Sequence, residues 1–537
     1  MTSTCPQCGA FTKLPTEGLD LTTLVDPQTA ARHMKLMQTN DPPVGITPAY
    51  LRDVLSKTSS RLGVLDGEIS RLRVQLQQLE EEHLLLSDYH RNTSSILSPL
   101  RRVPDEIIAE IFAWTMPSPA ESEGFDVTQS PWILGHISSH WRAIALSIPS
   151  LWSMVSIRPG SAANPLPMAE LQLRRARNLK IHFYGDEDED ATEQLNLFNF
   201  LARHSAVWEE LSIQLTTFLV PRLVALRGRL PLLRRLWIQW DREGSDRGVD
   251  SIQCFDNAPS LVDVGSIGES RFIPILLPAH QLTSYRVDGP WREHQSLLKA
   301  ARNLVEARIV IVFDQDRFWP DADPIDMPHL QRLYVSDVSV LKYVRAPALS
   351  EIAMHLGREE DPAAEFDAFL SRSSCTPQRL CLTGLPSAVV CTELLKKHTF
   401  ITRLALAFDA ADAARDHNEN EYDIYNLLAE IVATHLVAFT YKAEEAPVLP
   451  HLEELYFGVL AGVFLVDYPL FLDMLESRTR AGTSLCSAAF LTTKQRAELD
   501  DAAAERFDAL ESEGLSVWVE SGARNMIELW MYACPWN

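Results

Sequence analysis

Cysteines are few and scattered in this chain. Of eight in 537 residues, only Cys5 and Cys8 lie close together, a pattern that suits a reducing compartment rather than a disulfide-stabilised secreted protein. The chain also shows no charged-then-apolar leader at Met1, and its longest uncharged apolar run, 456–466, is too short to span a bilayer. We therefore expect a cytoplasmic or nuclear protein that does not engage a membrane.

Basic residues are scarce relative to acidic ones. The net charge is −23 and is unevenly placed: residues 1–250 carry 25 Lys and Arg against 30 Asp and Glu, whereas residues 251–537 carry 24 against 42. Nucleic-acid binding depends on basic side chains that neutralise phosphates, so this acidic half argues against such a partner. A charged ligand would be a basic one, unless the excess only keeps the surface soluble.

The sequence lacks the motifs of the common catalytic classes. None of the patterns G-x-S-x-G, G-x-G-x-x-G, G-x-x-x-x-G-K-[ST] or H-E-x-x-H occurs. The acidic run 186–190 lacks the Gly and the distal Glu of an EF-hand calcium loop. We therefore predict no catalytic residue, no cofactor and no enzymatic activity. An enzyme whose site uses none of these motifs is the alternative.

The first 46 residues are polar, contain proline and show no sustained period, which is typical of a disordered tail. Within them, Cys5 and Cys8 have the spacing of one half of a zinc knuckle. Structural zinc takes four ligands, and His33 is the only histidine among the first fifty residues. We therefore predict no metal site; zinc would need a second pair from another chain.

A long helix is expected over residues 47–92. Thr47 followed by Pro48 is a typical helix start, with a capping side chain and proline at the first helical position. Apolar residues then alternate at three- and four-residue spacing, with one histidine among them: Leu62, Leu65, Ile69, Leu72, Leu76, Leu79, His83 and Leu86. This pattern predicts a coiled coil, formed by a homodimer or with a partner. The alternative is that the helix folds back on the segment that follows it.

Residues 96–157 carry two short apolar helical patterns. Pro104 suits the first turn of a helix, and Asp105 and Glu106 complement its positive end. A second helix is expected from Pro131, followed by a short strand or turn. The apolar residues of the two patterns are Ile107, Ile108, Ile111 and Phe112, then Ile133, Leu134, Ile137, Trp141, Ile144 and Ala145. Helices this short cannot bury that surface among themselves, so the rest of the chain covers it or a partner does.

This segment resembles the F-box motif, in particular the F-box-like proteins abundant in mushroom-forming fungi. The matching stretches are Leu100–Ile107, the Ile108 to Phe112 face, the Trp132 to Ala145 helix and the Pro149 to Trp152 close. Val103 and Ser138 stand where Leu and Cys are usual, and 115–130 is an insert. The resemblance implies docking on a Skp1-like adaptor of a cullin–RING ubiquitin ligase, with the rest of the chain holding a target protein. The residues implied in Skp1 binding are Leu100, Pro104, Ile107, Ile108, Ile111, Phe112, Leu134, Ile137, Trp141, Leu151 and Trp152.

Residues 165–537 contain a degenerate repeat of the form Leu-x-x-Leu-x-apolar. The clearest copies place a leucine at 233, 261, 282, 304, 330 and 349, which are 28, 21, 22, 26 and 19 residues apart, and a later copy surrounds Leu452. This spacing is close to that of leucine-rich repeats, in which each unit supplies one short strand and stacking buries the apolar side. Weaker copies begin at Leu179, Trp208, Arg379 and Thr402.

The sequence thus predicts an α/β protein with an N-terminal coiled-coil helix, a small helical F-box and an irregular leucine-rich-repeat-like solenoid. Helices are expected on the convex side at 363–370, 388–397, 422–437 and 494–510, then a strand at 515–519 and a terminal cap at 525–532. The Asn of strict leucine-rich repeats is absent. A generic α/β domain is therefore the alternative fold, and a non-ligase scaffold built from the coiled coil and the repeats is the alternative function.

Overall fold

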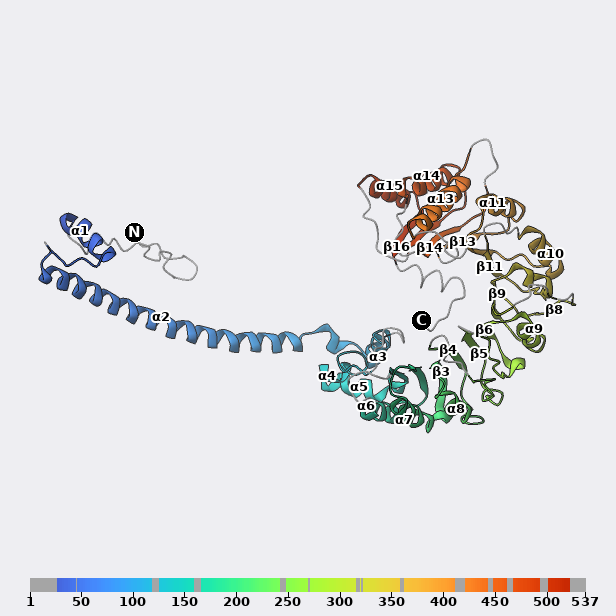
Figure 1. The fold of residues 1–537 in the computed structure, drawn as a ribbon, viewed down its shortest axis with the longest axis horizontal. Helices are drawn as coiled ribbons and strands as arrows, with labels where there is room; N and C mark the ends of the chain where they lie inside the picture. Colours follow the sequence, from blue (N-terminus) through green and yellow to red (C-terminus); the bar gives the residue numbers. More distant parts are fainter. Residues whose placement is uncertain are drawn as a thin grey trace. The chain divides into compact units, whose positions relative to one another are not determined.

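The chain forms two compact units, Met1–Pro104 and Asp105–Asn537. The computed structural model (Figure 1) describes residues 27–521, apart from 45, 118–124, 159–165, 242–247, 269–270, 315–318, 320–321, 358–361, 411–420, 443–447, 461–466 and 493–500. Cys5, Cys8 and the expected terminal cap at 525–532 therefore lie outside the described residues. Among the helices that are described, none combines the length and apolar character needed to cross a bilayer.

The first unit is dominated by one long helix, α2, which spans Pro48–Ile96. Thr47 lies in extended backbone before it, and its side-chain oxygen accepts a hydrogen bond from the Tyr50 N–H at 3.4 Å, as the Thr-Pro start predicts. The helix runs past the expected end at 92. It is preceded by α1 (Pro27–Gln38) and followed by the 3-10 turn η2 (Pro99–Arg102). The prediction of a tail without structure is wrong for 27–38.

Helix α2 exposes most of its length. Val54 is the one residue of α2 that is buried in the described part of this unit. The predicted seam is solvent-exposed: Leu62 is 59% exposed, Leu72 51% and Leu79 63%. Within the described part of its own unit, the apolar side of this helix therefore has no cover.

The second unit begins with short helical pieces: α3 (Asp105–Trp114), α4 (Leu134–Ile137), α5 (Ser139–Ser147) and the 3-10 turn η3 (Pro149–Trp152). The single helix expected from Pro131 is two helices, which corrects that prediction. Ser138 is extended, with φ −156° and ψ 164°, and its hydroxyl accepts a hydrogen bond from the Trp141 N–H at 3.1 Å. Serine favours this capping role over a helix interior, so the chain turns there.

A parallel sheet of 14 strands follows within the described residues, and each strand pairs with the strands before and after it in this order. The strands are β1 (Met154–Ile157), β2 (Leu179–Tyr184), β3 (Trp208–Leu215), β4 (Arg235–Trp240), β5 (Asp263–Ile267), β6 (Ser284–Gly289), β7 (Glu306–Ile311), β9 (Arg332–Val335), β11 (Glu351–Leu356), β12 (Arg379–Gly384), β13 (Arg403–Asp409), β14 (Glu454–Leu460), β15 (Ser487–Thr492) and β16 (Ser516–Ser521). A separate two-stranded piece pairs β8 (Ile325–Asp326) with β10 (Val344–Arg345).

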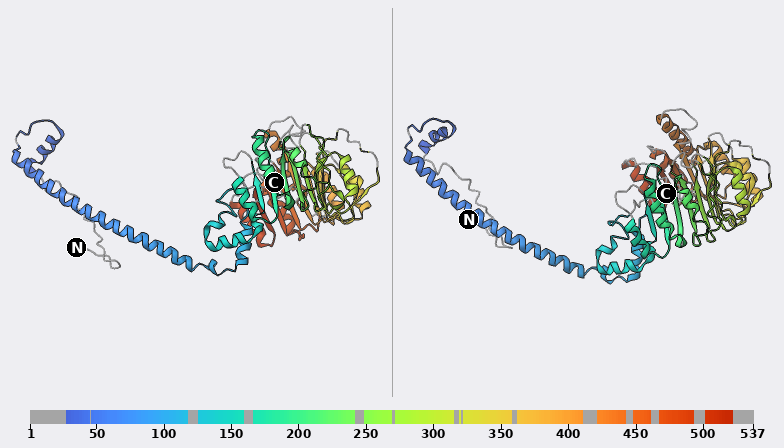
Figure 2. Two further views of the ribbon diagram at one scale, coloured as in Figure 1. Left: turned by 90° about the horizontal axis from the view of Figure 1, so that it is seen from below. Right: turned by 60° about the horizontal axis from the view of Figure 1, so that its bottom comes forward.

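Helices cover one face of this sheet. They are α6 (Leu166–Arg175), α7 (Ala191–Ala202), α8 (Val220–Val224), α9 (Trp291–Ala300), α10 (Ala363–Ser373), α11 (Ala388–Lys397), α13 (Glu421–Phe439), α14 (Tyr468–Arg480) and α15 (Asp501–Ser512), with the short 3-10 turns η4 (Ser205–Val207), η5 (Ala279–Gln281) and η6 (Val338–Tyr343). The helices lie along the outer side of the curved sheet, and no helix among the described residues lies on its inner side (Figures 1 and 2). The helices expected around 363–370, 388–397, 422–437 and 494–510 are α10, α11, α13 and α15.

One local arrangement recurs along the sheet. The six leucines of the predicted repeat are all buried, and each precedes the first residue of a strand by two positions, as Leu261 precedes Asp263. The backbone enters each strand through a tight turn, in which the leucine N–H donates to the carbonyl three residues earlier. The strand positions expected from the repeat are therefore confirmed. Each of these strands begins where it does because the leucine two positions earlier is buried in the core.

The helical pieces at the start of this unit continue directly into the sheet. Strand β1 pairs with β2 in parallel register. The Gln172 side chain donates to the Trp152 carbonyl at 3.2 Å, and the Arg175 guanidinium lies 4.2 Å from the centre of the Trp152 ring. The boundary predicted between 157 and 165 therefore does not separate two compact units.

Candidate protein-docking surfaces

Helix α3 has a buried side and an exposed side. Ile108 and Phe112, one turn apart, are 2% and 0% exposed. Phe112 lies against Trp141 of α5, with ring centroids 4.9 Å apart, and Trp141 is itself half-buried. These contacts hold α3 on α5, so the inner side of α3 is core.

A second aromatic pair closes the same core. The rings of Trp132 and Trp152 meet edge to face at 5.0 Å, and the Trp152 indole N–H donates to the Ala145 carbonyl at 2.8 Å. Leu134 and Leu151 are also buried, at 3% and 2% exposure. Five residues named for Skp1 binding are thus interior residues: Ile108, Phe112, Leu134, Leu151 and Trp152. As direct contact residues they were predicted wrongly, because sequence periodicity does not tell which side of a short helix faces inward.

The exposed side of α3 is also apolar. Ile107 is 53% exposed, Ile111 42% and Trp114 83%, and their i, i+4, i+7 spacing places them along one stripe. Exposed large apolar side chains concentrate in this part of the unit. In the described part of residues 105–537, six of eleven lie in its first 42 positions: Ile107, Ile111, Trp114, Val127, Ile137 and Leu146. We call this set of six residues, which are grouped by their position along the chain, the apolar patch.

The patch includes residues that the sequence reasoning missed. Trp114 and Leu146 were not named, although Trp114 follows Ile111 by three positions on the same helix. Among the named residues, Ile107, Ile111 and Ile137 lie in the patch. Leu100 and Pro104 are exposed but belong to the first unit.

Polar contacts shape the helices that carry the patch. The His140 side chain at the start of α5 lies 3.2 Å from the Asp105 carboxylate at the start of α3. The Arg142 guanidinium donates to the Gly135 carbonyl at 2.6 Å and so connects α5 to α4. These contacts are solvent-exposed, so they orient the helices rather than contribute much stability.

The helix-free face of the sheet is the second surface. At the edge where the strands begin, parallel register aligns charged residues of alternating sign, which we call the charge row: Lys180, Glu210, Arg235, Asp263, Glu306, Arg332, Glu351 and Arg379. Ser284 occupies the register position between Asp263 and Glu306. Each charge therefore has neighbours on strands that lie about 20 to 30 residues away along the chain.

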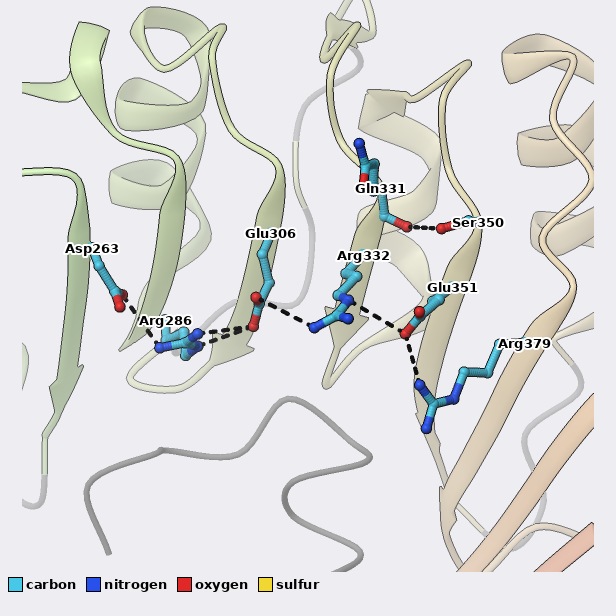
Figure 3. A network of polar contacts seen from close by, with 8 residues as sticks. All are labelled: Asp263, Arg286, Glu306, Gln331, Arg332, Ser350, Glu351 and Arg379. Atoms are coloured by element: carbon cyan, nitrogen blue, oxygen red, sulfur yellow. Dashed lines mark hydrogen bonds and ion pairs between the residues drawn. The ribbon is translucent and has the colours of Figure 1, made fainter. Parts of the chain in front are cut away.

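Ser284 carries no charge, and Arg286 supplies the cation that is missing at that position of the charge row. It lies two positions further along β6, on the same face, and reaches back between two carboxylates (Figure 3). Its guanidinium lies 3.2 Å from Asp263 and 3.0 Å from Glu306, and its side chain is 10% exposed. Burial raises the pKa of the Asp263 carboxyl, and the Arg286 charge opposes that shift. The small Ser284 side chain leaves room for this geometry.

Small side chains line the helix-free face over the later strands. Ala353, Cys381 and Ala405 form a buried cluster on adjacent strands, and Tyr334 and Tyr456 pack against it. Burial raises the pKa of the Cys381 thiol far above its usual range, so this cysteine is not an activated nucleophile. The cluster is thus a buried apolar layer with two aromatic rings packed against it.

Four histidines are buried in the described part of the sheet unit: His182, His294, His398 and His435. The Tyr285 hydroxyl meets His294 Nδ1 at 2.9 Å, and His294 Nε2 lies 3.1 Å from the Gly289 carbonyl. Desolvation lowers the pKa of His294, and likewise of His182 and His435, to about 4. These imidazoles are neutral at pH 7 and serve the core.

Comparison with protein-family models finds no match for this chain, and a search of curated proteins finds no significant match either.

Proposed function

We propose that this chain is the substrate-recognition subunit of a Skp1-cullin-F-box type ubiquitin ligase. The observation that carries the proposal is the apolar patch: exposed isoleucines and a tryptophan concentrate in the segment whose residues resemble an F-box. An exposed apolar patch of this kind suits a protein interface, because the free energy of the system falls when a partner removes apolar surface from water.

The sheet is the part that holds a target in this proposal. We propose that residues 165–537 are an irregular leucine-rich-repeat array. A buried leucine lies two positions before each of β4, β5, β6, β7, β9 and β11, and the spacings of 19 to 28 residues between these leucines support the proposal. The charge row pairs its own charges, so it offers little net charge to a ligand. Recognition would rest on the half-buried aromatic side chains Tyr334 and Tyr456, which pack over the buried cluster of small residues.

The mechanism is proximity. The chain contributes no bond-breaking group; it holds a target protein near ubiquitin that the ligase carries. Tethering raises the effective concentration of the target's lysines at the ubiquitin thioester. Activity therefore depends on two simultaneous contacts, one at the apolar patch and one on the helix-free face.

The test is co-expression of the full chain with a Skp1-like adaptor, with and without Ile107→Asp and Ile111→Asp together. Both side chains point away from the core, so the variant should fold. We expect a stoichiometric complex for the unmodified chain and at least about thirtyfold weaker binding for the double variant, the loss typical of a hot spot of about 2 kcal/mol. The matched control is Val389→Asp on α11, which is 65% exposed and far along the sequence from the patch.

Two results would refute the docking assignment. One is an unmodified chain that does not bind the adaptor; the other is a double variant that binds as tightly as the control. Either would favour the second candidate, a scaffold that assembles proteins without a ligase. The exposed apolar seam of α2 is the observation that supports this second candidate.

A further inference from the structure

We propose that α2 pairs with α2 of a second copy of this chain as a parallel, in-register coiled coil. This inference does not rest on adaptor binding. It starts from the exposed seam, which follows a heptad pattern through eight successive positions. In heptad notation the a positions are Leu62, Ile69, Leu76 and His83, and the d positions are Leu65, Leu72, Leu79 and Leu86.

The isolated helix has little to hold it. An exposed helix gains most of its stability from packing an apolar side, and α2 packs almost none of its own against the described residues of its unit. Five of the six seam leucines are between half and two-thirds exposed, for example 56% at Leu76 and 60% at Leu86, and Leu65 is partly buried. Gly63 and Gly67 lie at heptad positions b and f, where an added Cβ would meet nothing within 4 Å. The two helix-weakening residues thus lie off the seam and leave it continuous.

Charges beside the seam select the partner. In a parallel, in-register pair, a g residue faces the e residue five positions later on the other helix. Arg61 at g would face Asp66 of the second copy, and Glu68 at g would face Arg73 of the second copy. The next two such pairs each include an uncharged residue, Gln75 with Glu80 and Glu82 with Ser87. This helix is therefore complementary to itself, and no like-charged pair arises.

The antiparallel arrangement is less favourable. An antiparallel pair that covers all eight seam positions has its two-fold axis midway between Leu72 and Leu76. Residues at g then lie near g residues of the other helix and residues at e near e residues, which brings together Glu68 with Glu82, Asp66 with Glu80, and Arg73 with its own counterpart. All three pairs are like-charged.

A shift of the antiparallel pair by one heptad avoids those contacts but aligns only six of the eight seam positions with one another. The parallel pair is the arrangement that covers the whole seam and opposes no like charges.

The dimer would carry two sheet units. Each copy would present its own apolar patch and its own helix-free face, so one assembly would offer two target-binding faces. A target with two copies of a recognised segment would then bind with avidity.

The first test is the mass of the full chain by size-exclusion chromatography with light scattering. We expect twice the chain mass of 60.4 kDa at micromolar concentration, and the chain mass for Leu72→Asp with Leu79→Asp. The matched control is Val64→Asp with Val74→Asp, which changes residues that are 57% and 58% exposed but lie off the seam. The control should remain a dimer. A monomeric unmodified chain, or a dimer in the seam variant, would overturn the proposal.

The second test addresses orientation by exchanging charges. Arg61→Glu alone and Asp66→Arg alone should each raise the dimer dissociation constant at least tenfold. The two together should return it to within about threefold of the original, because the exchanged charges again face each other. In the antiparallel pair that covers the whole seam, Asp66→Arg alone would instead tighten the dimer, because it places a cation beside Glu80. A tighter dimer for that single variant, or a double variant no tighter than the two single variants, would overturn the parallel register.

Discussion

Replacing Arg286 should lower the unfolding free energy of the chain substantially. The change Arg286→Met keeps the length and apolar stem of the side chain and removes its charge. Asp263 and Glu306 would then face each other across β6 without a cation between them. Both carboxylates are 17% exposed, so water compensates only in part.

The expected loss follows from that burial. Removing one partner of a buried ion pair costs about 3–5 kcal/mol in unfolding free energy. Glu306 keeps the Arg332 guanidinium at 3.9 Å, so we expect a loss at the lower end of that range, about 3 kcal/mol. Replacing the carboxylates as well, with Asp263→Asn and Glu306→Gln, should recover most of the loss. The sign of the pH dependence is also set. Burial already raises the pKa of the Asp263 carboxyl, and without the opposing Arg286 charge it rises further, so the variant should regain stability as pH falls and protonation of Asp263 removes the repulsion.

Urea unfolding of the full chain gives the measurement. Far-UV circular dichroism and tryptophan fluorescence should be followed together, because coincident transitions justify a single free energy. The control is Arg345→Met. Arg345 lies at a similar distance, 3.1 Å, from its partner Asp326, but the two side chains are 53% and 68% exposed. That change should cost no more than about 1 kcal/mol. An Arg286→Met loss equal to the control would refute the reasoning.

Three further outcomes test other parts of the structure. Phe112→Ala should lower the unfolding free energy by about 3–5 kcal/mol, since the ring is fully buried, whereas Trp114→Ala should change it by less than about 0.5 kcal/mol. The unfolding free energy should fall as the pH is lowered from about 6.5 to about 4. In that range the histidines of the unfolded chain bind protons and three of the buried histidines of the folded chain do not, so each of the three lowers stability by up to about 1.4 kcal/mol per pH unit. Gly265→Ala should cost about 1–3 kcal/mol, because an added Cβ would overlap the Trp237 ring.

Each of these has its own check. Equal effects of the Phe112 and Trp114 changes on the urea midpoint would contradict the assignment of the two sides of α3. For the acid range, His294→Gln should flatten the slope of stability against pH; an unchanged slope would mean that this histidine is already charged in the folded chain. The raised carboxyl pKa values of Asp263 and Asp288 act in the opposite direction and reduce the net slope. Gly67→Ala, on open helix surface, should instead stabilise α2 by about 0.5–1 kcal/mol.

Local patterns were sufficient for several elements of this protein. The Thr47-Pro48 start of α2 and the strands that begin two residues after each repeat leucine were all predictable. A capping side chain or a leucine that must reach the core acts on its own few residues, and that action shows in the sequence. The helix α11 matches its predicted limits of 388–397 for the same reason.

Sequence patterns alone therefore specified the α/β class, the long helix and the strand positions. Packing in three dimensions was needed to show which side of α3 faces outward, and it added Trp114 and Leu146 to the apolar patch. The break at Ser138 is local instead: its hydroxyl accepts a hydrogen bond from the Trp141 N–H and starts a new helix despite the continuous apolar period. The charge row could not be predicted, because its members meet only when parallel register aligns strands that lie far apart along the chain. Contacts of that kind depend on how the strands pair side by side, and this pairing is a property of the whole sheet.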